Sequence, residues 1–318
     1  MSKYILDFEK SIRSIEEKIH SIENSSNQND LTSNTLISLK SQLDREITNT
    51  YSNLNRWQKV QLARHPERPH SIDYIENIVE DWLELHGDRK FADDKSIITG
   101  FGYINNIKCA IIAQEKGRNT KDRLYRNFGM PKPEGYRKAL RIMKLAEKFQ
   151  LPVITLIDTP GAYPGIGAEE RGQSQAIADN LLNMSLLKVP IISIVIGEGA
   201  SGGALAIGLS DKILCLENSW YSVISPEGCA SILFADTSRN KDAAESLKLT
   251  SEDLYEMNIA DTIIEEPLGG IHHNPNEVYK NVVDILCKDI NYLTNLSVKD
   301  LINQRMSKYD NIGKFLDE

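Results

Sequence analysis

The sequence predicts an α/β fold, and three features support this prediction. From about residue 97, short apolar runs rich in β-branched residues alternate with segments of helical spacing. Turns rich in glycine and proline separate the two kinds of segment. The chain has 318 residues, which is long enough for one large core with appended segments. Strands that alternate with helices pair in parallel through right-handed crossovers, so we expect a mostly parallel sheet.

Residues 1–65 differ from the rest because their apolar residues recur at helical spacing only. One stripe runs through Ile5, Phe8, Ile12, Ile15, Ile19 and Ile22, and a second through Leu36, Leu39, Leu43, Ile47, Leu54 and Trp57. A polar run over 24–30 interrupts them, which predicts two amphipathic helices in a hairpin. Their apolar stripes must pack on the main domain or on a second subunit.

A proline-containing segment over 65–70 ends this helical region, since each proline disfavours helix at the residue before it. We therefore place a junction there. The predicted division is an N-terminal helical hairpin over 1–68, a core over 69–270 and a C-terminal helical segment over 271–318.

Inside the core the pattern predicts individual elements. Strands are expected over 97–103, 108–113, 151–157, 190–196, 212–216 and 220–224, the first two joined by a turn at Asn105-Asn106. Helices are expected over 135–150 and 170–187, from 203, from 226 and, in the C-terminal segment, over 276–306.

Composition and charge exclude several classes of protein. The chain is 41% hydrophobic and 26% charged, and its net charge of −8 argues against general nucleic-acid binding. It opens with no signal sequence, and no apolar run reaches the ~18 residues of a membrane span, so we expect a soluble protein that stays where it is made. The four cysteines are far apart, which argues against a zinc knuckle or a disulfide framework and predicts small apolar core residues.

Positive charge is concentrated between Lys116 and Lys148. Eleven Lys or Arg residues stand there against three Asp or Glu, a local balance of +8. A solvated helix face explains such a run. The alternative is a surface that receives phosphates, carboxylates or an acidic partner.

Three predicted strands end in turns marked by glycine, and ligands of open α/β sheets bind at the carboxyl ends of strands. The first turn, over 158–167, is Asp-Thr-Pro-Gly-Ala-Tyr-Pro-Gly-Ile-Gly. Its prolines and glycines predict a fixed irregular loop between a strand and a helix.

The second turn follows the strand over 190–196 and contains Gly197, Gly199, Gly202 and Gly203 among small residues. Without Cβ atoms there, another molecule can approach the backbone closely. N–H groups at a helix start are unpaired and lie at the positive end of the helix dipole, so two adjacent glycine amides suit a developing oxyanion. Alternatively, the glycines only let the helix pack tightly against the sheet.

The third turn contains Ser225, Pro226 and Glu227. Serine suits the N-cap, proline the first helical position, and an acid the positive helix end, so capping alone can explain this turn.

Three motif lookalikes bear on other enzyme classes. The segment over 199–203 fits the G-x-S-x-G nucleophile elbow, but the only histidines after it, His272 and His273, lie in a Gly/Pro/Asn-rich loop. The Asp-Thr-Pro-Gly run at 158–161 resembles a GTPase switch, yet the chain has no G-x-x-x-x-G-K-[ST] phosphate loop. The glycines that follow do not continue into a dinucleotide-binding motif.

Five blocks of sequence, in this order, resemble the family of carboxyltransferase alpha subunits of acetyl-CoA carboxylase. They cover 128–140, 157–165, 168–174, 197–208 and 222–233. The likeness spans nearly the whole chain, including the N-terminal hairpin and the run over 266–270, and is far more specific than any single glycine motif.

The resemblance implies a crotonase-like (ClpP/crotonase) core of repeated ββα units. It implies a homologous beta subunit that carries zinc and most of the acetyl-CoA site, in an α2β2 heterotetramer, and no metal in this chain. Biotin carboxylase and the biotin carboxyl carrier protein complete the implied complex, and ATP binding belongs to the complex as a whole. The implied location is the cytoplasm, or the plastid stroma for a plastid-encoded chain.

The implied reaction moves a carboxyl group from carboxybiotin, presented by the carrier protein, to acetyl-CoA. The product, malonyl-CoA, is the first committed intermediate of fatty-acid synthesis. Such chemistry needs oxyanion stabilisation and positioning more than a side-chain base. By the resemblance, Gly202 and Gly203 form the oxyanion hole for the biotin ureido oxygen. The positions expected to bind substrate are Gly161, Ala162, Gly165, Gly199, Ser201, Pro226 and Glu227.

The chain departs from the family pattern at two places. Ala200 stands where many relatives have glycine, and Gln114 lies in a run that replaces Gly-His-Gln, so we assign no role to position 114. Two other functions stay open. One is a stand-alone crotonase-type acyl-CoA hydratase or isomerase, with Glu198 or Glu227 as its base, and the other is a non-catalytic scaffold subunit.

Overall fold

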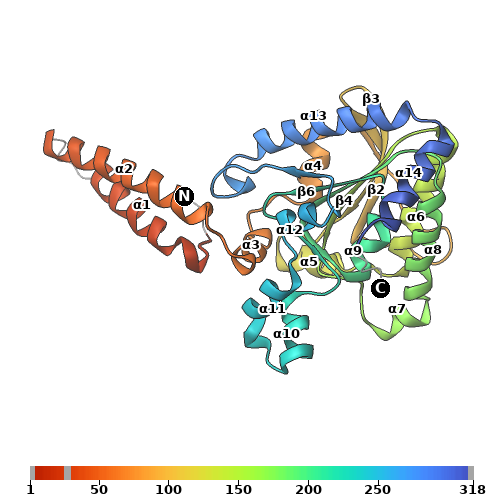
Figure 1. Cartoon of the computed structure of the whole chain (residues 1–318), viewed down its shortest axis with the longest axis horizontal. Coiled ribbons are helices and arrows are strands. Elements are labelled where there is room, and N and C mark those ends of the chain that lie inside the picture. The colour runs from red at the N-terminus through yellow and green to blue at the C-terminus, as the bar shows by residue number, and fades with distance from the viewer. Residues whose placement is uncertain (1–3, 25–29, 314–318) are drawn as a thin grey trace, which may run out of the picture.

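A sheet of eight strands forms the centre of the molecule in the computed structural model, which describes residues 4–24 and 30–313. The strands are β1 (Glu80–Glu84), β2 (Ile97–Ile104), β3 (Ile107–Gln114), β4 (Val153–Thr159), β5 (Ile191–Ala200), β6 (Lys212–Leu216), β7 (Trp220–Ser222) and β8 (Thr262–Ile264). Their order is β1-β2-β3-β4-β5-β6-β8, and β7 pairs with β5. Figure 1 shows helices on both sides of this sheet.

Strand pairing is antiparallel at one edge and parallel elsewhere. β1, β2 and β3 run antiparallel, and β2 and β3 form a hairpin. At its tip Asn105 and Asn106 both have positive φ, 46° and 66°, which is the conformation of a two-residue hairpin turn. From β3 through β4, β5 and β6 to β8 the neighbours are parallel. The expected hairpin and the mostly parallel sheet are both confirmed.

One face of the sheet is covered by α6 (Pro133–Phe149), α8 (Gln173–Leu186) and α9 (Ser201–Gly208). Proline in the first turn starts α6, and Gln150 in the left-handed conformation ends it. Its buried residues recur every three or four positions and include Tyr136, Ala139, Ile142, Met143 and Ala146. This spacing places one apolar stripe on the β-branched side chains of the sheet.

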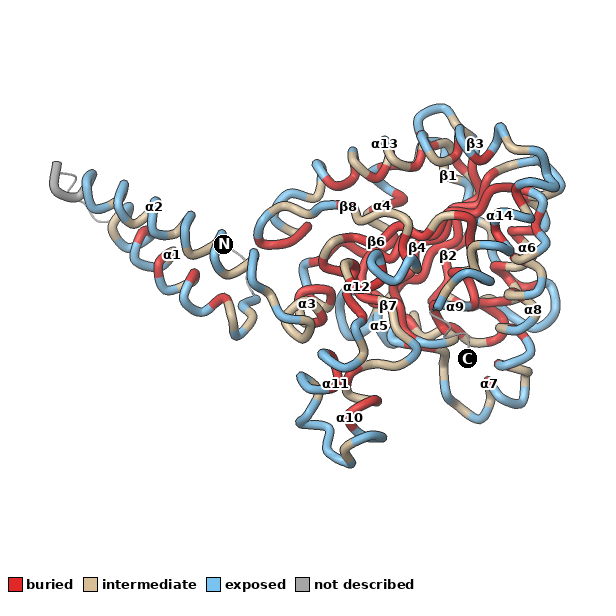
Figure 2. The backbone as a smooth tube through the Cα atoms, viewed as in Figure 1, coloured by how far each residue is buried: buried red, intermediate tan, exposed pale blue. Residues whose placement is uncertain are grey.

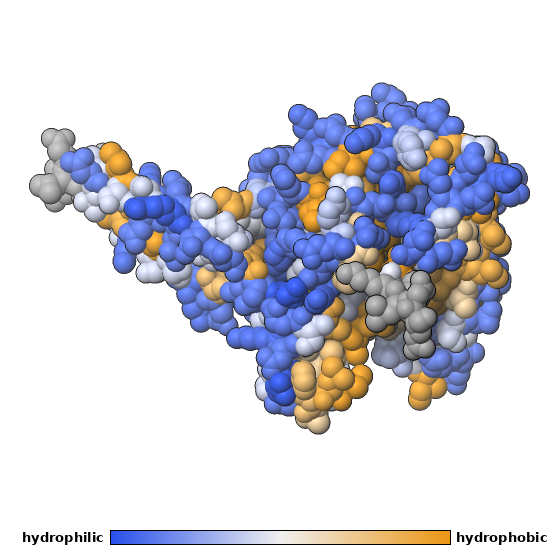
Figure 3. All heavy atoms as spheres, viewed as in Figure 1, coloured by the Kyte–Doolittle hydropathy of each residue, from blue (hydrophilic) through white to orange (hydrophobic). Residues whose placement is uncertain are grey.

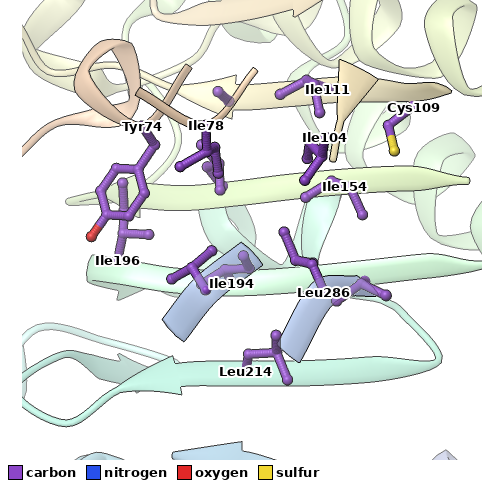
Figure 4. Packing of buried hydrophobic residues seen from close by; sticks show 14 of the residues in the cluster. Tyr74, Ile78, Ile104, Cys109, Ile111, Ile154, Ile194, Ile196, Leu214 and Leu286 are labelled. Atoms are coloured by element: carbon purple, nitrogen blue, oxygen red, sulfur yellow. The ribbon is translucent and has the colours of Figure 1, made fainter. Parts of the chain in front are cut away.

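The opposite face is covered by α4 (Ser71–Ile78) and α13 (Pro275–Thr294). In Figure 4, side chains from both helices pack over residues of the neighbouring strands from β2 to β6. The C-terminal helices therefore complete the core rather than lying apart from it. The last helix, α14 (Val298–Asp310), is held by Arg305, whose fully buried guanidinium donates to both carboxylate oxygens of Asp211 at 2.8 Å and to three backbone carbonyls.

The N-terminal helices α1 (Lys10–Glu23) and α2 (Asp30–Tyr51) form the predicted hairpin, which extends away from the sheet (Figures 1 and 2). The buried residues of α1 are Ile12, Ile15 and Ile19. In the structure α1 and α2 pack on each other, and the expected packing of this stripe on a second subunit stays a prediction. The following helix, α3 (Arg56–Ala63), packs on the core through Val60 and Ala63 against Trp220.

Several predicted boundaries differ from the structure, and the helix expected over 276–306 is divided into α13 and α14. β5 continues to Ala200, beyond the expected end at 196, so two of the glycines lie inside the strand. The helix expected over 170–187 is divided by Gly172, whose φ of 79° interrupts it, into α7 (Ile166–Glu170) and α8. The expected helix from 226 is α10 (Pro226–Phe234). Elements that the sequence did not reveal are α4, β1, α5 (Thr120–Tyr125), α11 (Asn240–Leu247), α12 (Ser251–Glu256) and β8.

Three of the four cysteines are buried, as expected for small apolar core residues. Cys109, Cys215 and Cys229 are buried and Cys287 is half-buried, and all four are free thiols. Over the described residues, no helix combines the length and the apolar character needed to cross a bilayer.

Candidate active site

The loops that leave β4 and β5 meet at the carboxyl ends of these two adjacent parallel strands. A Cβ atom on Gly203 would lie 2.4 Å from the carbonyl carbon of Gly161 and 2.6 Å from the nitrogen of Ala162. Real Cβ contacts are never this short, so only glycine lets the two loops touch here. Gly161 itself has a φ of 141°, which side chains other than hydrogen disfavour. Two sequence-predicted glycine turns thus form one structure.

Helix α9 begins at this contact and presents uncapped amides. Ala200 is its N-cap and provides no side-chain hydrogen bond. The N–H groups of the first turn, from Ser201 to Gly203, therefore have no intrahelical acceptor and lie at the positive end of the dipole. Beside them is a hollow of about 270 Å³, lined mainly by apolar side chains, among them Leu205, Tyr221 and Val223. These amides could hold an oxyanion that sits against an apolar wall.

Ser201 occupies the strand-to-helix junction with a φ of 56°, a conformation that nucleophile elbows also adopt. The histidines that a triad would require lie elsewhere. His272 stacks on His65 with ring centroids 4.0 Å apart, and His273 packs against His272. Neither lines the hollow that contains Ser201. The described residues therefore offer no serine-hydrolase triad at this turn.

A chain of ion pairs lies on the other side of the strand ends. Lys116 Nζ is 2.5 Å from Asp158 and 2.6 Å from Glu198. Arg64, just after α3, contacts Glu198 at 2.6 Å and Glu227 at 2.5 Å. These charges border a cavity of about 280 Å³ that separates the strand ends from the segment after α3. The network ties β4, β5, α10 and the N-terminal region together.

The electrostatics of this network favour its charged form. Burial alone would raise the pKa of Glu198, but the attraction of Lys116 and Arg64 outweighs burial and lowers that pKa from 4.5 to about 2. Burial would likewise lower the pKa of Lys116, and the carboxylates of Asp158 and Glu198 raise it instead. Glu198 is thus held as an anion and is poorly suited to act as a general base.

The depressed pKa of Glu198 predicts a pH dependence of stability. A carboxylate with a lowered folded-state pKa stabilises the protein above its unfolded pKa of 4.5, and the contribution is lost as pH falls through about 2. We expect Glu198→Gln to lower the free energy of unfolding by about 3 kcal/mol at pH 7. At pH 4 this difference should shrink by about 1 kcal/mol. Urea unfolding of the wild-type protein and of Glu198→Gln at pH 7, 5 and 4 measures this difference in unfolding free energy. A difference that did not change with pH would contradict the lowered pKa of Glu198.

The remaining predicted positions are divided between the start of α9 and the network of ion pairs. Gly199 lies inside β5, where an added Cβ would meet the ring of Tyr221 at 2.6 Å. Gly165 is the N-cap of α7. Pro226 and Glu227 open α10 behind the capping hydroxyl of Ser225. The structure therefore groups Gly161, Ala162, Gly202, Gly203 and Ser201 around the start of α9, and places Glu227 with the ion pairs.

Three residues of the site were not predicted from sequence. Gln114, to which we assigned no role, donates from Nε2 to the carbonyl of Gly203 at 2.7 Å and accepts from the backbone N–H of Asp158 at 3.1 Å. It is fully buried and so fixes α9 relative to β4. Lys116 stood out only as part of the basic run, and Arg64 carried no signal, because only folding brings α3 to the sheet.

The described residues contain no group of three or more His, Cys, Asp or Glu side chains that could hold a metal ion. Ala200, the departure from the family pattern, is buried in one cluster with Val60, Ala63 and Trp220. Its methyl group thus helps to seat α3.

Comparisons with known proteins place this geometry in a family. A family model described as acetyl co-enzyme A carboxylase carboxyltransferase-like matches residues 5–313. The chain is 52% identical over 312 residues to the acetyl-coenzyme A carboxylase carboxyl transferase subunit alpha of Flavobacterium johnsoniae, with 98% of each chain covered.

Two solved structures share the fold at low identity. One is transcarboxylase 12S, with a TM-score of 0.57 and 20% identity over 72% of this chain and 44% of that one. The other is the beta subunit of geranyl-CoA carboxylase from P. aeruginosa, with a TM-score of 0.55 and 17% identity over 80% of this chain and 45% of that one. The fold is therefore the crotonase-like fold of carboxyltransferases. Within that class, the chain belongs to the acetyl co-enzyme A carboxylase carboxyltransferase-like family.

Proposed function

We propose that this chain is the alpha subunit of an acetyl-CoA carboxylase carboxyltransferase and that Gly202 and Gly203 supply its oxyanion-binding amides. The observation that carries the proposal is the contact between Gly203 and Gly161, which fixes the uncapped start of α9 at the end of β4. The net reaction moves a carboxyl group from biotin N1′ to the methyl carbon of acetyl-CoA, and the methyl proton passes to biotin.

The residues of this chain act by holding and orienting. The first-turn amides of α9 donate hydrogen bonds to a ureido oxygen, where the positive end of the helix favours negative charge. Leu205, Tyr221 and Val223 form an apolar wall beside the same place, from which a covering partner would exclude water. Gln114 and the loop at Gly161 and Ala162 keep the amides aligned. Of the other predicted positions, Ser201 lines this site, and we propose that Gly165, Gly199, Pro226 and Glu227 act by shaping the elements around it, Gly165 at the start of α7, Gly199 inside β5, and Pro226 and Glu227 at the start of α10.

A partner subunit completes the site in this proposal, and the exposed apolar residues beside it support that. Val223 is 76% exposed, and on α10 Ile232 is 73% and Leu233 64% exposed. Figure 3 shows apolar atoms gathered on this part of the molecule. Apolar patches beside a functional site are typical of subunit contacts. We infer that a carboxyltransferase beta subunit covers this surface in an α2β2 heterotetramer and brings the acetyl-CoA site and the zinc.

The other components follow from the same proposal. Biotin arrives on the biotin carboxyl carrier protein after biotin carboxylase has charged it at the expense of ATP, so this chain binds no cofactor covalently. We propose the cytoplasm as its location, or the stroma for a plastid-encoded chain. The three-part division at 68 and 270 stays a prediction.

Reconstitution tests the function. The chain is co-expressed with a beta subunit of the family, and malonyl-CoA formation from carboxybiotin and acetyl-CoA is measured for each subunit alone and for both together. We expect activity only with both present. Crotonase-type hydration or isomerisation of an acyl-CoA by this chain alone would favour the hydratase alternative. Full activity of the beta subunit alone would favour a scaffold.

A further inference from the structure

Another hollow, which shares no lining residue with the hollow at α9 or with the cavity at the ion pairs, contains a concentration of positive charge. It has a volume of about 500 Å³ and lies between the segment over 86–90, α6 and α8. Its charged lining residues are Arg89, Lys90, Arg137, Arg141 and Lys144, against Asp88 and Asp179. We call it the α6–α8 groove. A volume of this size accommodates a small organic ligand.

Structural ion pairs account for part of the basic run over 116–148 and for Arg137 in this groove, but not for the other four cations of the groove. Lys116, Arg118, Arg126, Arg137 and Lys138 all have carboxylate partners. Within the described residues, no carboxylate lies within 4.0 Å of a charged nitrogen of Arg89, Lys90, Arg141 or Lys144. A solvated helix face therefore does not explain the grouping, because these cations converge on one hollow.

Arg141 is fixed from behind. Its Nε donates to the carbonyl of Gly87 at 3.0 Å, and one Nη donates to the carbonyl of His86 at 3.1 Å. Arg89 donates to the same His86 carbonyl at 3.1 Å, so two guanidinium groups converge on one oxygen. Burial and the neighbouring Arg89 charge lower the pKa of Arg141, which means that its cation is poorly compensated. The remaining N–H groups of Arg141 are free to form a fork to an oxyanion.

Hydrogen bonds fix the loop that contains Arg89 and that accepts the hydrogen bonds of Arg141. Asp88 accepts hydrogen bonds from the backbone N–H groups of Lys90, Phe91 and Ala92, and it pairs with Arg137 at 2.8 Å. The geometry of the groove therefore exists before any ligand binds, which lowers the entropic cost of binding.

The walls of the groove add two further features. Leu140 and Leu145 provide apolar surface. The buried side-chain oxygen of Asn180 has no hydrogen-bond partner in the described part of the chain, while its Nδ2 donates to the carbonyl of Ala206 in α9 at 3.0 Å. A hydroxyl or amino group deep in the groove would satisfy that oxygen.

We propose that the α6–α8 groove binds the phosphate groups of a small phosphorylated ligand. Phosphate matches the convergent guanidinium and ammonium groups, and the leucines and Asn180 match an organic portion that carries a hydroxyl or amino group. This site is distinct from the glycine turns and does not depend on the function proposed above.

Isothermal titration calorimetry of the full chain with inorganic pyrophosphate at low ionic strength tests the proposal. We expect measurable binding that Arg141→Gln weakens at least tenfold. Lys144→Gln, a change at an exposed side chain, should weaken it about threefold. Lys148→Gln removes the same charge from the exposed end of the same helix, outside the groove, and should leave binding unchanged. Thermal unfolding confirms that each variant is folded.

Absence of pyrophosphate binding would overturn the proposed site. Equal weakening by Lys148→Gln and Lys144→Gln would overturn it too, because pyrophosphate would then respond only to a diffuse positive field. Competition then identifies the source of the phosphate. If coenzyme A displaces pyrophosphate and pantetheine does not, the site is supported and its ligand is the nucleotide end of a CoA ester. If pyrophosphate binds and coenzyme A does not displace it, the site is supported and its ligand is a different phosphorylated molecule.

Discussion

Carboxyl transfer by the complex with a beta subunit is expected to fall at least about 100-fold when Gly203 is replaced with alanine, the size typical of losing one oxyanion donor. The added Cβ would stand 2.4 Å from Gly161 and 2.6 Å from the nitrogen of Ala162, both backbone atoms that no side-chain rotation can move. The loop after β4 must shift, and the amides of α9 shift with it.

The close approach of Gly203 to Gly161 makes a substitution larger than alanine harder to interpret. Gly203→Val would displace the loop further because its side chain is larger, so alanine is the sharper test. Malonyl-CoA formation and urea unfolding are measured on the same preparation. Gly167→Ala is the matched control, since its Cβ would meet only the flexible end of Arg171 at 3.1 Å. Near-normal transfer by Gly203→Ala would refute the oxyanion assignment.

Replacing Lys116 with methionine is expected to lower the free energy of unfolding by about 3 kcal/mol and to reduce transfer as well. Lys116 lies between Asp158 and Glu198, whose side chains are only 7% and 8% exposed. Removing the cation leaves Asp158 without an ion-pair partner, beside the buried carboxylate of Glu198, which keeps only Arg64. Repulsion between the two carboxylates separates the two strand ends from which both glycine turns begin.

Urea unfolding and malonyl-CoA formation check this prediction against Lys121→Met, which removes an exposed lysine from α5. That control should change stability by less than about 0.5 kcal/mol. If the two variants were equally stable, the ion pairs would contribute nothing to the site. Loss of transfer without loss of stability would instead assign Lys116 to substrate contact.

Much of the core was predictable because local patterns determine it. Apolar β-branched runs gave β2 to β6, the Asn105-Asn106 turn gave the hairpin, and the spacing of apolar residues gave α6 and α13. The strands β1 and β8 were not found, because three of the five residues of β1 are acidic and β8 has only three residues, so neither shows an apolar strand pattern.

The sequence by itself determined the α/β class, the hairpin, the glycine turns and the family resemblance, since each depends on residues close together in the chain. Only the tertiary structure decided which glycines lie together at the start of α9. It placed Gly199 inside a strand and brought Gly203 against Gly161. It also brought Arg64 to Glu198 and Gln114 to Gly203, across 134 and 89 residues of chain. Such contacts leave no local pattern, because they exist only when the strands pair and the helices close over them.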